Sequence, residues 1–221
     1  MPNPPALPRA LLAGAGIVFY ALAMHHTLAV QPRPDLAAAL LIAPVTLASL
    51  LAAWNSAARL RWLTACGLAA ITLAGLWPLL TRHIGWLYFL EHVTIFGLLG
   101  LLFGRSLMRN HTPLCTQIGA VLHERMSERS IHYTRQVTVA WTIFFSASVG
   151  VSALLFFFAS FEAWSFFANV LGMPLMGALF AGEFAVRCHV LPPEERGSLL
   201  GTIQAWNRRK TPRTPAPDTP A

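Results

Sequence analysis

The sequence IGWLYFLEHVTIFGLLGLLF occupies residues 84–103 and contains a single carboxylate, that of Glu91. A helix rises about 1.5 Å per residue, so about 20 apolar residues are enough to cross the hydrocarbon of a bilayer. An amphipathic helix of a soluble protein would instead carry polar residues along one whole face. The stretch therefore predicts a transmembrane helix, closed by Gly104 and Arg105.

Comparable apolar blocks recur throughout the 221 residues, of which 55% are hydrophobic and 11% charged, with a mean hydropathy of +0.54. Soluble domains carry about 25% charged residues. We therefore predict an all-α polytopic membrane protein with a single transmembrane domain over residues 1–206. Its six spans are expected at residues 10–30, 36–54, 62–80, 84–103, 137–158 and 163–186. Residues 207–221 form a basic tail rich in Pro and Thr, which we expect to be disordered.

The basic residues predict an orientation. We assigned the termini and the connections between the six spans alternately to the two sides of the membrane. Of the 16 Lys and Arg residues, 14 then fall on one side, and only Arg33 and Arg82 fall on the other. The positive-inside rule then puts both termini in the cytoplasm, as in a multi-pass protein of a bacterial inner membrane. Ala21-Leu-Ala23 could alternatively be a signal cleavage site. Because the apolar stretch continues to Val30, we expect the first span to be retained.

The distribution of charge and the spacing of the cysteines argue against nucleic-acid binding and against metal binding. The chain has a net charge of +7 and a pI near 10.4, but its basic residues are spread over loops and the tail, so we expect no nucleic-acid partner. The three cysteines, Cys66, Cys115 and Cys188, show no metal-binding spacing and are predicted to be isolated thiols. We expect no metal and no cofactor.

The connection from Arg105 to Arg135 is long enough to contain a further helix. Thr112 is a candidate N-cap for a helix that starts at Pro113. Apolar residues then recur at helical spacing at Leu114, Ile118, Val121, Leu122 and Met126. This pattern predicts an amphipathic helix between the fourth and fifth spans, either lying at the membrane surface or packed on the cytoplasmic ends of the spans. The candidate contacts for lipid headgroups or a docking partner are Arg105, Arg109, Arg125, Arg129 and Arg135.

Ionisable groups within spans are costly and are the default functional candidates. The predicted topology puts the following candidates in the periplasmic half of the membrane: His25, His26, Tyr88, Glu91, His92 and Asn169. One hypothesis is a polar pocket in which Glu91 is the acid–base group or anchors a ligand, with one histidine as its partner. The alternative is that Glu91 pairs with a histidine and fixes helix packing. Adjacent residues on a helix lie about 100° apart, so Glu91 and His92 cannot face one small ligand together.

Glu183 and Arg187 are four residues apart and are predicted to form an ion pair within the last span. Motifs for several enzyme classes are missing from the sequence, including a P-loop, G-x-S-x-G and H-E-x-x-H. Haem ligation by His25 or His26 with His92 is geometrically conceivable, but there is no second histidine pair. No catalytic residue can be assigned.

Several motifs in the second half of the chain are Phe103-Gly-Arg-Ser-Leu107, Thr112-Pro-Leu114, Tyr133-Thr-Arg-Gln-Val-Thr-Val-Ala-Trp141 and the stretch from Trp164 through Asn169 to Glu183. Over roughly Glu91 to Val190, these resemble a family of small bacterial inner-membrane proteins found in gene clusters for aryl polyene (xanthomonadin-type) pigments. The resemblance implies a context in which polyunsaturated acyl chains are built on carrier proteins. It transfers no catalytic role.

This context leads to an expected function without strong enzymatic activity. We expect an accessory membrane protein that assists assembly, anchoring or movement of a lipid-like aryl polyene product. Its partners would be membrane lipids, with an acyl carrier protein or polyene biosynthetic enzymes at the basic loop. The alternatives are a small transporter or flippase that uses the polar pocket, or a membrane-embedded acyl or headgroup transferase.

Overall fold

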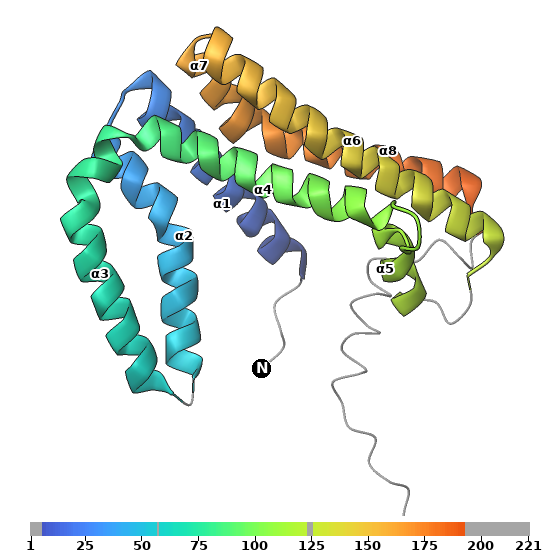
Figure 1. Cartoon of the computed structure of the whole chain (residues 1–221), viewed down its shortest axis with the longest axis horizontal. Helices are drawn as coiled ribbons and strands as arrows, with labels where there is room; N and C mark the ends of the chain where they lie inside the picture. Colours follow the sequence, from blue (N-terminus) through green and yellow to red (C-terminus); the bar gives the residue numbers. More distant parts are fainter. Residues whose placement is uncertain (1–5, 57, 123–125, 193–221) are drawn as a thin grey trace, which may run out of the picture. The chain divides into compact units, whose positions relative to one another are not determined.

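The computed structural model describes residues 6–56, 58–122 and 126–192, with side chains from Gly14 onward except that of Leu122, and these residues form helices without strands (Figure 1). The predicted all-α class is confirmed. In chain order the elements are α1 (Ala6–His25), the π-helix η1 (His26–Val30), α2 (Pro34–Asn55), α3 (Arg59–Arg82), α4 (Ile84–Ser106), α5 (Leu114–Leu122), α6 (Glu128–Phe158), α7 (Phe161–Ser165), the π-helix η2 (Phe166–Leu171) and α8 (Gly172–Val190).

Five helical segments in the described ranges are long and apolar enough to cross a membrane. They are α2, α3, α4, α6 and the continuous stretch Phe161–Val190, which comprises α7, η2 and α8. They lie where five of the six spans are predicted, and they make the chain a polytopic membrane protein. At the remaining predicted span, the apolar helix Gly14–Val30 is shorter, and it continues the first turns of α1.

The start of α6 differs from the prediction. The fifth span was expected to begin at Val137, whereas α6 begins at Glu128 and contains 31 residues. At about 1.5 Å per residue this helix is longer than the hydrocarbon is thick. Hydropathy locates only the part that matches the hydrocarbon, and a helix can continue beyond it into the headgroups through polar turns.

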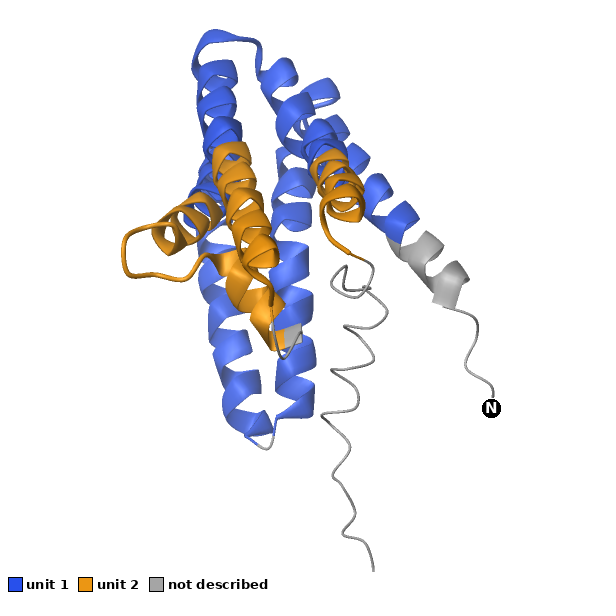
Figure 2. Ribbon diagram, turned by 90° about the vertical axis from the view of Figure 1, so that its right-hand side faces the viewer, with its two compact units in different colours: residues 1–98, 146–177 blue, residues 99–145, 178–221 orange. Residues whose placement is uncertain are grey.

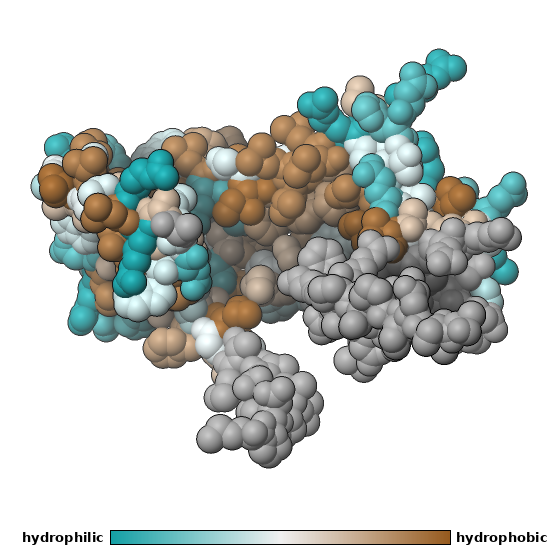
Figure 3. All heavy atoms as spheres, turned by 90° about the horizontal axis from the view of Figure 1, so that it is seen from below, coloured by the Kyte–Doolittle hydropathy of each residue, from teal (hydrophilic) through white to brown (hydrophobic). Residues whose placement is uncertain are grey.

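Large apolar side chains lie on the outside of the helices (Figure 3). Phe158 is 84% exposed and Ile71 is 72% exposed, and α3 has no buried residue. In water this surface would be unfavourable by roughly 25 cal/mol per Å² of apolar area. Lipid tails remove that penalty, as expected for membrane-spanning helices.

Contacts divide the chain into two compact units (Figure 2). Unit 1 comprises residues 1–98 and 146–177, and unit 2 comprises residues 99–145 and 178–221. Because α4, α6 and α8 each contribute to both, the single predicted domain has two centres of packing. The predicted tail at residues 207–221 lies outside the described residues, as does Arg125.

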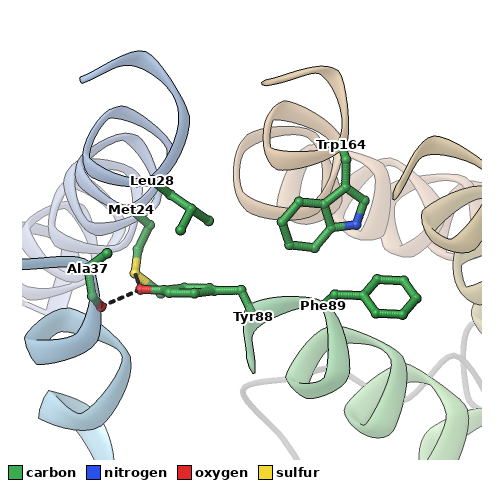
Figure 4. Close-up of a cluster of buried hydrophobic side chains, with 6 residues drawn as sticks. All are labelled: Met24, Leu28, Ala37, Tyr88, Phe89 and Trp164. Carbon is green, nitrogen blue, oxygen red and sulfur yellow. Dashed lines mark hydrogen bonds between the residues drawn. The ribbon is translucent and has the colours of Figure 1, made fainter. Parts of the chain in front are cut away.

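The core of unit 1 gathers side chains from five elements, namely Met24, Leu28, Ala37, Tyr88, Phe89 and Trp164 (Figure 4). The Tyr88 hydroxyl donates a hydrogen bond of 2.7 Å to the carbonyl oxygen of Ala37. Trp164 is fully buried, and its Nε1–H donates to Oγ of Ser152 at 3.0 Å. These bonds connect α4 to α2 and α7 to α6, so polar groups fix the register of an otherwise apolar core.

The helices α2 and α3 form an antiparallel hairpin within unit 1 (Figure 1). Nε1 of Trp77 donates to a carboxylate oxygen of Asp35 at 2.7 Å near one end of the hairpin. At the turn, the Arg59 guanidinium lies 3.9 Å from the centre of the Trp54 ring. Aromatic and charged groups of this kind are typical of the interface between hydrocarbon and headgroups. Between the two helices runs a shallow apolar groove lined by Ala39, Ile42, Ala43, Thr46, Leu47, Leu50, Leu73 and Trp77.

We predict that Ser152→Ala destabilises the protein by about 1–2 kcal/mol, because the buried indole N–H of Trp164 loses its acceptor. The measurement is the free energy of unfolding in mixed micelles. Ser146→Ala is the matched control, since Ser146 is an exposed serine of the same helix. Equal effects of the two substitutions would show that the Trp164–Ser152 bond does not stabilise the unit.

Candidate functional site

Two helices of unit 1 change from α to π geometry, at η1 and at η2. π-Helical segments are rare and often mark functional sites, because widening the helix redirects side chains and disturbs the backbone hydrogen-bond ladder. The end of α1 packs against η2, while η1 packs against α7. The two segments are therefore neighbours, and the polar residues around them form the candidate site.

A chain of hydrogen bonds connects three polar side chains at this junction. Nδ1 of His25 lies 3.0 Å from Oγ of Ser165. The Asn169 amide donates to the same Oγ at 3.2 Å and to the carbonyl oxygen of Ser165 at 3.1 Å. Ser165 is fully buried. The ring of Phe166 meets the His25 ring edge-on, with centroids 5.7 Å apart. We call His25, Ser165 and Asn169 the polar chain.

The polar chain ends in groups that can still form hydrogen bonds. With the residues that the structure describes, Nε2 of His25 and the amide oxygen of Asn169 make no hydrogen bond. An imidazole nitrogen can donate or accept according to the tautomer, and an amide oxygen accepts. The Asn169 end can therefore accept a further hydrogen bond, and the His25 end can donate or accept one.

His92 flanks η2 from a different helix. Its ring stacks on Phe96, with centroids 4.4 Å apart, and lies 6.1 Å from the ring of Phe167. Nδ1 of His92 is buried and has no hydrogen-bond partner among the described residues. Leaving such an atom unpaired costs about 1–3 kcal/mol. A polar group that reached this nitrogen would recover that free energy.

The structure does not gather all six residues of the predicted pocket. His25 and Asn169 meet through Ser165, whereas His26 is exposed. Tyr88 is buried in the core, where the Ala37 carbonyl accepts its hydrogen bond. Glu91 is exposed and forms no ion pair with a histidine in the described part of the chain. The Glu–His pairing considered as an alternative is therefore not seen there.

Ser165 is a functional candidate that sequence reasoning missed. A single serine in an apolar span usually bonds only to its own helix backbone, so it attracts no attention. The available signal was its spacing of four residues from Asn169, which puts both side chains on one helix face. The partner His25 is 140 positions away in sequence and could not be inferred from that spacing.

A second polar cluster lies in unit 2. The predicted ion pair is confirmed, with an Arg187 nitrogen 2.8 Å from a carboxylate oxygen of Glu183. The sequence did not predict the third member, Tyr133, whose hydroxyl donates to the same carboxylate at 2.7 Å. The Glu183 side chain is 11% exposed. The donors of Arg187 and Tyr133 replace hydrogen bonds to water that a shielded carboxylate cannot make, and the cluster joins α6 to α8.

The short helix α5 of unit 2 is capped by residues from neighbouring helices. The Leu114 N–H donates to Oγ of Ser106 at 3.0 Å, and the Cys115 N–H donates to Oγ1 of Thr138 at 3.2 Å. The prediction that Thr112 supplies the cap is wrong, because its hydroxyl makes no hydrogen bond with described residues while Ser106 occupies that role. Burial raises the pKa of the Cys115 thiol, which disfavours the reactive thiolate.

The arginines of the predicted docking surface remain available to solvent or headgroups. Arg105, Arg109, Arg129 and Arg135 are all exposed, and none forms an ion pair within the described ranges. No three His, Cys, Asp or Glu side chains are grouped to hold a metal ion in the part of the chain that the structure describes.

We predict that His25 and Ser165 are energetically coupled. In a double-mutant cycle of His25→Ala and Ser165→Ala, the coupling in unfolding free energy should be about 0.5–1.5 kcal/mol, as for hydrogen bonds between membrane helices. The control cycle combines His26→Ala with Ser165→Ala. Because His26 is exposed, its coupling energy with Ser165 should be near zero. Similar values in both cycles would contradict the polar chain.

We also predict that Tyr133→Phe lowers the unfolding free energy by about 1.5–3 kcal/mol, because the Glu183 carboxylate loses a charge-assisted hydrogen bond. The measurement is unfolding in mixed micelles. The same substitution in a Glu183→Gln background should cost clearly less, since the acceptor is then neutral. An equal cost in both backgrounds would assign the effect to the other hydrogen bond of the Tyr133 hydroxyl, which it donates to the backbone carbonyl oxygen of Glu183 at 2.9 Å.

No protein-family model, no curated protein and no solved structure matches this chain. Function is therefore inferred from the geometry of its polar groups.

Proposed function

We propose that this chain is an accessory protein of a bacterial inner membrane that assists the assembly, anchoring or movement of a lipid-like molecule. Given the sequence resemblance, the expected molecule is an aryl polyene product. The observation that carries the proposal is the polar chain at the junction of η1 and η2, with hydrogen-bonding groups left open among apolar membrane helices.

The chemistry of the site fits a long apolar molecule with a polar end. Free Nε2 of His25 and the free amide oxygen of Asn169 offer hydrogen bonds to an acyl carbonyl or hydroxyl group. The Phe166 ring lies edge-on to the His25 ring, and the Phe167 ring lies 6.1 Å from the ring of His92. Hydrogen bonds inside hydrocarbon meet little competition from water, so a few suffice to orient such a ligand.

The charge distribution supports the orientation. The positive-inside rule favours both termini in the cytoplasm, which puts the polar chain in the periplasmic half of the membrane. The exposed arginines around α5 then face the cytoplasm, where an acidic acyl carrier protein or a biosynthetic enzyme would dock.

A small transporter or flippase is the second candidate, favoured by the π segments. Transporters bind substrates where membrane helices are discontinuous, because interrupted backbone can be satisfied by the substrate. Here the π segment η1 directly follows α1, and the helix Phe161–Val190 contains the π segment η2, both beside the polar chain. The two candidates differ in where the product accumulates when the protein is missing.

The test is a chromosomal deletion in the host bacterium, complemented by matched amounts of wild-type chain, Asn169→Leu or the control Ser146→Ala. Total polyene is measured by absorbance of lipid extracts, and its location by membrane fractionation. We expect deletion and Asn169→Leu to lower membrane-bound product, and Ser146→Ala to restore it. Retention of normal amounts in the inner membrane, with loss from the outer fractions, would favour transport instead. Unchanged amount and location would contradict both candidates.

A further inference from the structure

The helix α5 packs on its neighbours through its polar face. The hydroxyl groups of Thr116 and Thr134 lie 2.7 Å apart, which joins α5 to α6. A Cβ added at Gly119 would lie 3.0 Å from the Met126 side chain, which precedes α6, and 3.9 Å from the Thr134 methyl group of α6, so this position also faces the packed side of α5. Thr116 is buried. Hydroxyl groups and a glycine thus occupy the face where an ordinary amphipathic helix has its apolar residues.

The apolar residues of α5 point the opposite way. At about 100° per residue, Leu114, Ile118 and Val121 cluster roughly opposite Thr116 and Gly119 on the helical wheel. Ile118 is 54% exposed and Val121 is 60% exposed. We call Leu114, Ile118 and Val121 the outer face of α5.

Short connections keep this outer face beside the membrane. The helix α4 ends at Ser106 and α6 begins at Glu128, and both are helices long and apolar enough to cross the bilayer. The hydrogen bond from the Leu114 N–H to Ser106 holds the start of α5 directly at the end of α4. The outer face is therefore tethered at the level where a spanning helix leaves the hydrocarbon.

The charge of the same segment complements an anionic lipid surface. Between residues 105 and 135 the chain has five arginines and two glutamates. The four arginines in the described ranges are exposed and unpaired by ion pairs there. Near an anionic bilayer each basic residue contributes about 1 kcal/mol of attraction. Exposed apolar residues flanked by arginines are the pattern of a helix that lies in the headgroup region.

We propose that the outer face of α5 inserts into the cytoplasmic leaflet, with its occupant the anionic lipid surface itself. The threonine face fixes α5 to α6 while Ile118 and Val121 enter the boundary between headgroups and acyl chains. The arginines then contact lipid phosphates rather than the acidic carrier protein or enzyme of the proposed function. This inference concerns unit 2 alone and does not depend on what unit 1 binds.

The test uses full-length protein in which Cys66, Cys115 and Cys188 are replaced by Ala. Single cysteines at position 118, 121 or 120 are labelled with the environment-sensitive fluorophore NBD, and the protein is reconstituted in vesicles that contain brominated lipids. Ala120 is the matched control, because it is exposed on the same helix but lies outside the outer face. Quenching at positions 118 and 121 should exceed that at position 120 by roughly threefold or more.

Vesicle composition tests the electrostatic part. Phosphatidylglycerol should increase quenching at position 118 relative to pure phosphatidylcholine, and high salt should reverse the increase. Equal, weak quenching at all three positions in both kinds of vesicle would overturn the proposal. Strong quenching that ignores lipid charge would overturn the assignment of an anionic surface. Circular dichroism of each labelled variant confirms that the helices are intact.

Discussion

Within hydrocarbon no water is present to accept a hydrogen bond from a side chain or a backbone group, and each unsatisfied group costs several kcal/mol. This constraint explains why two buried polar groups of unit 1 form hydrogen bonds between helices. The Trp164 indole reaches Ser152, and the Tyr88 hydroxyl reaches the Ala37 carbonyl. Apolar packing alone would not select these neighbours, because lipid tails are as apolar as the side chains they replace. The hydrogen bonds therefore specify which helices meet.

Hydropathy and charge were sufficient to predict the helical class and the approximate positions of the spans, because membrane insertion depends on the summed transfer free energy of about 20 residues. The polar partners were not predictable in the same way. The Ser106 hydroxyl and that of Thr138 cap α5 from positions 8 and 23 residues away. Serine and threonine are common in spans, and nothing local distinguishes one that bonds to its own helix from one that bonds to another. Only local pairs, such as Glu183 with Arg187, could be inferred from spacing.

The motifs that carry the family resemblance coincide with the residues that form these distant contacts. Tyr133 binds Glu183, Thr138 caps α5, Trp164 binds Ser152, and Asn169 belongs to the polar chain. Each contact needs a particular donor or acceptor at a particular position. A structural requirement therefore accounts for these four motif residues without any catalytic role.

The two units differ in whether their polar side chains have hydrogen-bond partners. In unit 2 the Glu183 carboxylate accepts hydrogen bonds from both Arg187 and Tyr133, and a group so fully paired has little capacity left for a ligand. In unit 1 the buried Nδ1 of His92 has no partner among the described residues, and the polar chain ends in Nε2 of His25. An open polar group within hydrocarbon costs free energy unless another group pairs with it. This difference supports the proposals that unit 1 binds a ligand and that unit 2 contacts the membrane surface.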